Sequence, residues 1–293
     1  MPEAPAETWT TRKLLVWTTQ RFERDAIDSP RLAAEMLLSH VLGVERLRLY
    51  TDPERPASHD ERARFRELVE RATQHEPVDY LVGQAPFYGM SLSVDARVLI
   101  PRPSTETLVD EAVAFARERG GSLSMADIGT GTGAIALAIA KALPEAKITA
   151  TDLHEGPLEV ARANAASLGL SERITFKQGD LLDPLQGERF DVLMSNPPYI
   201  PAGDLPGLDA NVRDHEPHAA LDGGKDGLDL IRRLLSGAPG HLASSGLLLL
   251  EYNGGPQTEV LRSLVQQAGC WSDMSVLKDH EGLDRVIRCV LSE

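Results

Sequence analysis

Residues 124–138 read SMADIGTGTGAIALA, and this stretch decides the fold class of the chain. The apolar run before the glycines is typical of a buried strand, and the run of Ala, Ile and Leu after them is typical of a helix. Three glycines at every second position let the backbone turn sharply and come close to a ligand, because glycine has no β-carbon. The stretch therefore predicts a strand, a ligand-binding loop and a helix in immediate succession.

Helical and strand patterns continue to alternate from Ser104 to the C-terminus. Apolar runs predict strands at about residues 124–128, 147–151, 174–177, 190–195, 246–252 and 285–291. Strands separated by helices favour a parallel, doubly wound α/β sheet with right-handed crossovers, and such sheets bind ligands at the carboxyl ends of their strands. We therefore expect a Rossmann-like domain over residues 104–293, with its site at that edge.

Polar residues at three strand ends predict a cleft for an adenosine group. Asp152 ends the second strand, where a carboxylate can accept hydrogen bonds from both ribose hydroxyls. Asp180 ends the third strand and could accept a hydrogen bond from the adenine amine, while Leu181 could pack on the adenine ring. The first strand and its loop supply Asp127, Gly129, Thr130, Gly131, Thr132 and Gly133 as cofactor-binding candidates.

The spacing of the glycines distinguishes two kinds of adenosine ligand. A dinucleotide fingerprint reads G-x-G-x-x-G and sets a pyrophosphate on a helix N-terminus. This loop reads G-x-G-x-G and opens with Asp127. A carboxylate there would repel a pyrophosphate but suits the sulfonium and ammonium groups of S-adenosylmethionine. S-adenosylmethionine is therefore the favoured cofactor.

A second motif, SNPPYIP at residues 195–201, follows another apolar strand. Proline cannot donate to a sheet ladder, so the strand must stop there. The simpler interpretation is a rigid turn. The alternative is that Pro197 and Pro198 hold the Asn196 amide, a carbonyl oxygen and the Tyr199 ring toward one small planar group.

The N-terminal part of the chain has a different character. Residues 1–83 are expected to form a helical domain, because apolar residues recur at helical spacing from about Thr8 to Val82. One helix starts at Ser29 and Pro30, and a capping box stands at residues 58–61. In residues 84–103, apolar residues alternate with smaller or polar ones from Phe87 to Val94, and Asp95-Ala96 separates them from the apolar run at residues 98–100, which predicts a hairpin connecting the two domains.

Two residues of this connector are candidate substrate contacts. Arg102 lies between two prolines, so its backbone is extended and its side chain has a fixed origin. Phe87 begins the alternating run. We expect the N-terminal helices and the segment from Phe87 to Arg102 to select the substrate.

The composition is that of a soluble globular protein: of 293 residues, 42% are hydrophobic and 25% charged. The net charge of −14 argues against a protein that mainly grips nucleic-acid backbone, since such binding depends on Lys and Arg. Cys270 and Cys289 have neither metal-ligand nor disulfide spacing, which indicates a reduced, cytoplasmic setting. The N-terminus lacks the positive charge of a signal peptide, and no apolar run reaches membrane-spanning length.

Taken together, DIGTGTGAIALA, ATD at residues 150–152 and SNPPYI resemble the amino-methyltransferases, in which an (N/D)-P-P-(Y/F/W) motif ends the fourth strand. Residues 77–110 (PVDYLVGQAPFYGMSLSVDARVLIPRPSTETLVD), residues 215–234 (HEPHAALDGGKDGLDLIRRL) and the small all-α N-terminal domain more narrowly resemble the HemK/PrmC-type protein glutamine methyltransferases. The resemblance covers nearly the whole chain. One departure is Ser104, where the family usually has an acidic residue, although serine can still cap the following helix.

The resemblance implies a class I S-adenosylmethionine-dependent methyltransferase domain. It also implies a substrate, the glutamine of the Gly-Gly-Gln motif in class 1 peptide chain release factors. If the Asn196 side-chain oxygen and the Pro197 carbonyl each accept one N–H, the glutamine nitrogen is held with its lone pair aimed at the methyl group. Tyr199 would cover the flat amide. Asn196, Pro197 and Tyr199 are thus the catalytic candidates, and Pro198 joins them in binding substrate. Asn196 is also a candidate contact of the cofactor.

Other functions remain possible at this point. A glutamine of a ribosomal protein or an exocyclic amine of DNA or RNA would present the same N–H groups, although the acidic charge and the lack of a sizeable target-recognition insertion argue against DNA. A binding protein that has lost catalysis is a third hypothesis, against which the intact motifs argue. We expect a monomer with no membrane contact and no direct binding of nucleic acid.

His215, Glu216 and His218 match no common zinc spacing, so we expect no metal site. The surrounding residues 209–224 are interpreted as a loop beside the cleft that helps admit a peptide. Glu251 and Asp284-Arg285 are given a structural interpretation.

Overall fold

The computed structural model describes residues 8–293, which form two compact units. One unit contains the N-terminal helices up to Gly83 together with Ala210–His215, and the other contains Gln84–Asp209 and Glu216–Glu293. Residues 1–7, which begin the stretch predicted not to be a signal peptide, lie outside the described residues. Among the residues from 8 onward, no helix is long and apolar enough to cross a membrane.

The helical unit packs around a core that includes the fully buried side chains Phe22, Leu37 and Phe65. The capping box at Ser58 and Glu61 is confirmed, since each side chain accepts the backbone N–H of the other residue. Ser29 makes no side-chain capping bond, so only the proline part of that predicted helix start is confirmed. The helices are α1 (Thr11–Arg24), α2 (Pro30–Leu42), α3 (Arg48–Thr51), α4 (His59–Thr73), α5 (Val78–Val82) and α9 (Ala210–Arg213).

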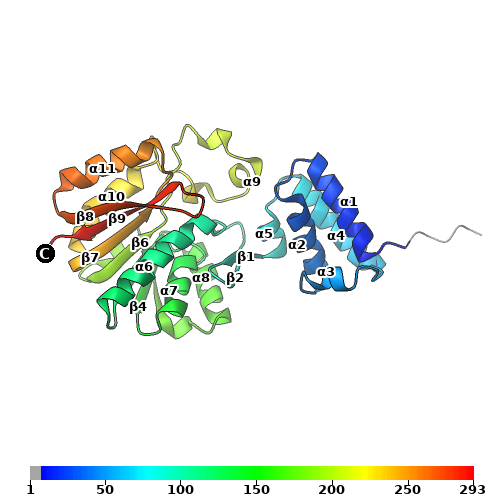
Figure 1. The fold of residues 1–293 in the computed structure, drawn as a ribbon, viewed down its shortest axis with the longest axis horizontal. Coiled ribbons are helices and arrows are strands. Elements are labelled where there is room, and N and C mark those ends of the chain that lie inside the picture. Colours follow the sequence, from blue (N-terminus) through cyan, green and yellow to red (C-terminus); the bar gives the residue numbers. More distant parts are fainter. Residues whose placement is uncertain (1–7) are drawn as a thin grey trace, which may run out of the picture. The chain divides into compact units, whose positions relative to one another are not determined.

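The second unit is built on a seven-stranded sheet with the order β5-β4-β3-β6-β7-β9-β8 (Figure 1). Its strands are β3 (Ser124–Ile128), β4 (Lys147–Asp152), β5 (Ile174–Gln178), β6 (Phe190–Ser195), β7 (Leu242–Glu251), β8 (Trp271–Lys278) and β9 (Asp284–Leu291). The order runs outward from β3 to β5 and then resumes at β6 on the other side of β3. The carboxyl ends of β3 and β6 therefore flank the topological switch point, where doubly wound sheets bind their ligands.

The doubly wound α/β sheet is confirmed, but the expected parallel pairing is wrong at one edge. Strand β9 pairs antiparallel with both β7 and β8, and β8 was not predicted. The sequence of β8, WSDMSVLK, lacks the long apolar run of a buried parallel strand, because it lies at the edge and is mostly half-exposed. No helix separates β8 from β9, so the two form a hairpin.

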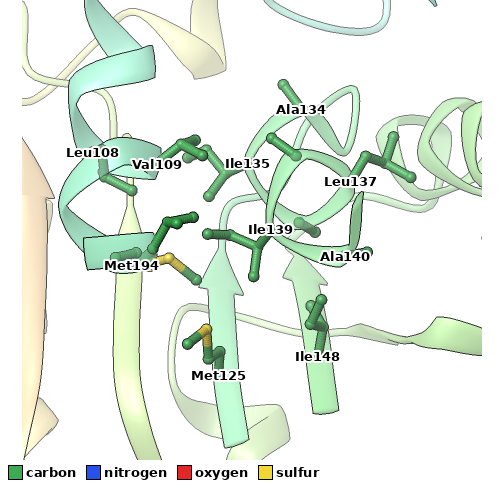
Figure 2. Packing of buried hydrophobic residues seen from close by; sticks show 14 of the residues in the cluster. Leu108, Val109, Met125, Ala134, Ile135, Leu137, Ile139, Ala140, Ile148 and Met194 are labelled. Carbon is green, nitrogen blue, oxygen red and sulfur yellow. The ribbon is translucent and has the colours of Figure 1, made fainter. Parts of the chain in front are cut away.

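Neighbouring residues of each central strand enter opposite cores. Met125 and Met194 belong to one buried cluster, with residues of α6 and α7, whereas Ala126 and Leu193 belong to the other, with residues of α10 and α11. Figure 2 shows the first cluster, in which α6 and α7 pack on β3, β4 and β6. The helices of this unit are α6 (Glu106–Arg119), α7 (Ala134–Ala142), α8 (Glu155–Ser167), α10 (Asp229–Gly237) and α11 (Pro256–Ala268).

The predicted hairpin in residues 84–103 forms, but its turn lies earlier than expected. Strand β1 (Gln84–Phe87) pairs antiparallel with β2 (Met90–Ser93), and the turn is Tyr88-Gly89 rather than Asp95-Ala96. Both turn residues have positive φ, 48° and 66°, which is the geometry that two-residue hairpins favour. The packing of Phe87, Met90 and Leu92 in the core joins the hairpin to the second unit.

Candidate functional site

A cavity of the second unit lies at the carboxyl edge of the sheet, where the sequence predicted a ligand site. Strands β3 and β6 end side by side, with Ile128 paired to Ser195. This register places the glycine loop next to the SNPPYIP motif. Nine of the candidate residues line the cavity: Gly129, Thr130, Gly131, Thr132, Asp152, Asp180, Leu181, Asn196 and Pro198.

The glycine loop has the backbone shape that its sequence predicts. Gly129, Gly131 and Gly133 all have positive φ, at 74°, 53° and 83°. The N–H groups of Gly129 and Thr130 both donate to the Thr151 carbonyl, at 2.9 and 2.8 Å, which anchors the loop to the end of β4. A β-carbon on Gly129 or Gly131 would meet no other atom within 4 Å, so a ligand can come close to the backbone there.

Asp152 links the end of β4 to the glycine loop. Its two carboxylate oxygens accept the N–H of Gly131 at 3.0 Å and the N–H of His154 at 3.1 Å. Burial raises the pKa of Asp152, although these backbone hydrogen bonds oppose the shift. The side chain is thus oriented at the cavity wall by the loop itself.

Asp127 lies beneath the loop and does not line the cavity. It is fully buried, and one carboxyl oxygen accepts the Thr130 hydroxyl at 2.6 Å and the Ala136 N–H at 3.2 Å. The other oxygen has no hydrogen-bond partner among the described residues, and burial raises the pKa of this carboxyl to about 7. When this carboxyl ionises, its negative charge repels a pyrophosphate and attracts a cation, so the loop fits S-adenosylmethionine better than a dinucleotide.

Asp180 and Leu181 form the wall contributed by the end of β5. Asp180 accepts a hydrogen bond from the Arg233 guanidinium on α10 at 2.6 Å. The sequence did not indicate this partner, because Arg233 looks like any solvated arginine of an amphipathic helix. Leu181 has a positive φ of 48°, which is an unusual conformation for a leucine, and it lines the cavity.

The Asn196 side chain is held by a residue far away in the sequence. Its amide nitrogen donates to the Thr105 hydroxyl at 3.1 Å, and Thr105 precedes helix α6. The preceding hydroxyl, that of Ser195, donates to the Ile128 carbonyl at 2.6 Å and joins the ends of β6 and β3. The expected role of Ser104 as a helix cap is wrong, since Ser104 makes no capping bond and donates to Glu251 instead.

The backbone of the SNPPYIP motif is packed against residues 221–227. The Ile200 N–H donates to the Leu221 carbonyl, and the Gly223 N–H donates to the Ile200 carbonyl. A β-carbon on Gly223 would lie only 2.8 Å from the Pro198 carbonyl oxygen, and one on Gly227 would overlap the Tyr199 carbonyl oxygen. Gly223 and Gly227 are therefore required for close contact with this motif.

Glu251 ends β7 and is fully buried. The same carboxyl oxygen accepts the Ser104 hydroxyl at 3.3 Å and the Tyr199 hydroxyl at 3.4 Å. Burial raises the pKa of Glu251 to about 7, and a hydrogen bond from Thr105 and the charge of Arg285 oppose that shift. Sequence reasoning gave this residue a structural interpretation, because a single acidic residue at a strand end carries no pattern.

The remaining candidates lie outside the cavity lining. The Arg102 guanidinium donates a hydrogen bond to the Glu216 carboxylate at 2.5 Å, and the Glu216 side chain is only 1% exposed. This ion pair joins the Pro-Arg-Pro segment, residues 101–103, to the loop that follows residue 215. Phe87 is 2% exposed in the hydrophobic core, which gives no support to its assignment as a substrate contact. Pro197 and Tyr199 complete the motif without lining the cavity.

The HEPH stretch contains His215, Glu216 and His218, for which the sequence predicts no metal site. Within residues 8–293, no group of three or more His, Cys, Asp or Glu side chains could hold a metal ion. Glu216, the acidic member of the HEPH stretch, is instead directed to Arg102 and to the Ile100 N–H.

Comparison with known proteins identifies the family. A family described as the PrmC N-terminal domain matches residues 13–83, and one described as the methyltransferase small domain matches residues 106–205. A release factor glutamine methyltransferase of Rhodopirellula baltica is 42% identical over 284 residues, covering 95% of both chains. One from Geobacter sulfurreducens is 40% identical over 287 residues, covering 98% of both chains.

A solved structure supports the fold. A methyltransferase from Pyrococcus furiosus matches with a TM-score of 0.53 at 20% identity, covering 70% of this chain and 90% of that chain. The predicted methyltransferase fold and the predicted family are both confirmed. The chain belongs to the family of release factor glutamine methyltransferases.

Proposed function

We propose that this protein transfers a methyl group from S-adenosylmethionine to the side-chain amide nitrogen of the glutamine in the Gly-Gly-Gln motif of class 1 peptide chain release factors. The observation that supports this most is that one cavity is lined by the glycine loop, Asp152 and Asn196 together. The relatives that carry the release factor name match over nearly their whole length, which supports the choice of substrate.

The cofactor would be held by three parts of the cavity wall. The glycine loop offers open backbone at Gly129 and Gly131, Asp152 offers carboxylate oxygens for ribose hydroxyls, and Asp180 with Leu181 offers a polar and an apolar contact for adenine. Bound there, S-adenosylmethionine supplies an electrophilic methyl group. The protein then has to place the substrate nitrogen, which is a poor nucleophile because its lone pair is delocalised into the amide carbonyl.

Asn196 and Pro197 would perform that placement. The Asn196 amide nitrogen donates a hydrogen bond to the Thr105 hydroxyl. The Asn196 side-chain oxygen is therefore the atom available to accept a substrate N–H. A second N–H would be accepted by the Pro197 carbonyl, and Tyr199 would cover the amide plane. Two acceptors also favour the positive charge that develops on nitrogen as it takes the methyl group and the cofactor leaves as a neutral thioether. The charged amide would then lose one N–H proton readily to water, so no strong general base is required.

The direct test of this function is incubation with labelled S-adenosylmethionine and purified class 1 release factors, followed by mass mapping. The label is expected on the glutamine of the Gly-Gly-Gln motif. Ribosomal proteins, DNA and RNA serve as parallel substrates in the same assay. Label found only on one of these, and not on a release factor, would contradict the proposed substrate.

Asp152→Ala is expected to weaken cofactor binding while the fold is kept. Loss of a carboxylate that accepts ribose hydroxyls should cost about 1.5–3 kcal/mol, the range for hydrogen bonds to charged groups. Calorimetric titration with the cofactor measures this loss. Glu118→Ala, which removes an exposed carboxylate outside the cavity lining, is the matched control and should bind normally. Unchanged affinity in Asp152→Ala would remove Asp152 from the site.

The helical unit is proposed to recognise the substrate protein. A chain that begins at Gln84 keeps the hairpin, whose Phe87, Met90 and Leu92 belong to the core of the second unit. It is expected to bind cofactor but to methylate a full-length release factor much more slowly than the whole chain does. Cofactor titration is the control for folding. Full activity of the shortened chain on that factor would show that the helices do not select it.

The setting that fits this function is the cytoplasm, and Cys270 and Cys289 are both free thiols in the structure. We infer that the protein acts there as a monomer on a protein substrate and does not bind nucleic acid directly. The formal charge of −14 supports the last point, because it disfavours approach to a phosphate backbone.

A further inference from the structure

The side chain of Gln257 joins the SNPPYIP motif to two other segments of the chain. Gln257 is 7% exposed and lies in the first turn of α11. Its amide nitrogen donates to the Tyr199 carbonyl at 2.9 Å and to the Asp226 carbonyl at 3.0 Å. Its amide oxygen accepts the Asn253 N–H at 3.1 Å. One buried amide therefore bonds to the backbone of three separate segments.

These partners fix the direction in which the Gln257 amide points. The Tyr199 and Asp226 carbonyls can only accept a hydrogen bond, and the Asn253 N–H can only donate one. A flipped amide would set its oxygen against two carbonyl oxygens and its nitrogen against an N–H. Only one orientation of this side chain makes all three hydrogen bonds, and that orientation holds the motif.

The prolines of the motif explain why it needs such an anchor. Pro197 and Pro198 have no backbone N–H, so two successive residues cannot donate a hydrogen bond to the surrounding structure. The Tyr199 carbonyl follows directly after them. Gly227 packs against the same place, since a β-carbon there would overlap both the Tyr199 carbonyl oxygen and the Gln257 amide nitrogen. The carbonyl, the glycine and the glutamine amide therefore lie together.

We infer that Gln257 is a positioning residue, which ties the SNPPYIP backbone at Tyr199 to α11 and so fixes the Pro197 carbonyl and the Tyr199 ring. This role rests on the proposed function, in which that carbonyl accepts a substrate N–H and the ring covers the amide plane. Gln257 is not among the residues that line the cavity, so it acts through the motif and not by contact with the cofactor.

The first test is Gln257→Met, which keeps the length of the side chain and removes all three hydrogen bonds. We expect kcat on a release factor to fall by about tenfold, while cofactor affinity stays nearly unchanged. This loss is smaller than the factor of about 10² that a shift of about 1 Å can cost. The reason is that Ile200 keeps its backbone hydrogen bonds with Leu221 and Gly223. Steady-state rates and calorimetric titration measure the two quantities.

Gln257→Asn is measured in parallel as a milder change. It keeps an amide but shortens the side chain by one methylene, which withdraws the donors from the Tyr199 carbonyl. It should also lower kcat, and it carries the test should Gln257→Met fail to bind cofactor. If neither variant binds cofactor, Gln257 supports the fold as a whole and the positioning role is overturned.

Thr258→Val is the matched control, because it removes buried hydrogen bonds from the same turn of α11. Thr258 is 6% exposed, and its hydroxyl is bonded to the Tyr252 hydroxyl at 3.0 Å and to Asp284 at 3.3 Å, neither of which belongs to the motif. Thr258→Val and Gln257→Met should both lower the melting temperature, but only Gln257→Met should lower kcat. Equal losses of kcat would indicate a general effect on the fold and would overturn the positioning role.

A double-mutant cycle with Gly227→Ala tests whether the two residues act on the same carbonyl. If they do, the double variant should be little slower than Gly227→Ala alone. Additive losses would overturn the positioning role.

The outcomes also separate this role from the proposed function. If a release factor glutamine is labelled and the Gln257 variants turn over normally, the positioning role fails and the proposed function stands. If only another substrate is labelled, the proposed function fails. The Gln257 variants are then compared on that substrate, where a normal rate would overturn the positioning role as well.

Discussion

Replacement of Asn196 by Ala is expected to reduce turnover on a release factor by about 10²-fold or more, comparable to the loss of one preorganised polar partner in other enzymes. The Asn196 side chain lines the cavity next to the glycine loop, and its nitrogen donates a hydrogen bond to the Thr105 hydroxyl at 3.1 Å. The Asn196 side-chain oxygen is thus left to accept the substrate N–H. Cofactor affinity should change little. Steady-state rates with labelled cofactor, together with calorimetric titration, measure the two effects separately.

Two further changes sharpen this test. Asn196→Asp keeps an acceptor oxygen in nearly the same shape, so it should keep more activity than Asn196→Ala, although it loses the N–H that Thr105 accepts. A release factor whose target glutamine is changed to glutamate offers no N–H pair and should not be methylated. Near-normal turnover by Asn196→Ala would mean that SNPPYIP is only a rigid turn.

The parts of the fold and site that could be predicted are those encoded within one short segment. The glycine loop is recognisable because its strand, turn and helix lie within residues 124–138, and Asp152 because it ends the next strand. To predict either feature, one needs only the local periodicity of the sequence and the rule that parallel strands have their carboxyl ends at the same edge of the sheet. The cavity lining contains both, as expected.

The parts that could not be predicted depend on contacts between distant segments. The Asn196 amide donates a hydrogen bond to Thr105, which is 91 residues away in the sequence. The Ser104 hydroxyl donates one to Glu251, which is 147 residues away. No single sequence carries a periodic signal for such a pair, so Glu251 and Arg233 could not be assigned to the site. Strand β8 was missed for a different reason, since an edge strand that stays half-exposed lacks the apolar run of a buried one.

Gly227 provides the second large expected effect. A β-carbon there would overlap the Tyr199 carbonyl oxygen, and the residue has a φ of 77°, where an L-residue loses about 1–2 kcal/mol. The overlap cannot easily be relieved from the helix side, because Leu228 is buried in the core. It cannot easily be relieved from the motif side either, because the same Tyr199 carbonyl accepts the Gln257 amide at 2.9 Å.

Gly227→Ala is therefore expected to displace the SNPPYIP backbone and to lower kcat by about 10²-fold, since a shift of about 1 Å can cost that much in a positioned reaction. Cofactor affinity should fall far less, because no hydrogen bond among the described residues joins the glycine loop or Asp152 to residues 221–227. Gly203→Ala is the matched control: a β-carbon there meets no atom within 4 Å and its φ is not positive, so its rate should be normal. Equal rates for the two variants would show that the close packing of LDGGKDG on the motif does not set the position of the catalytic amide.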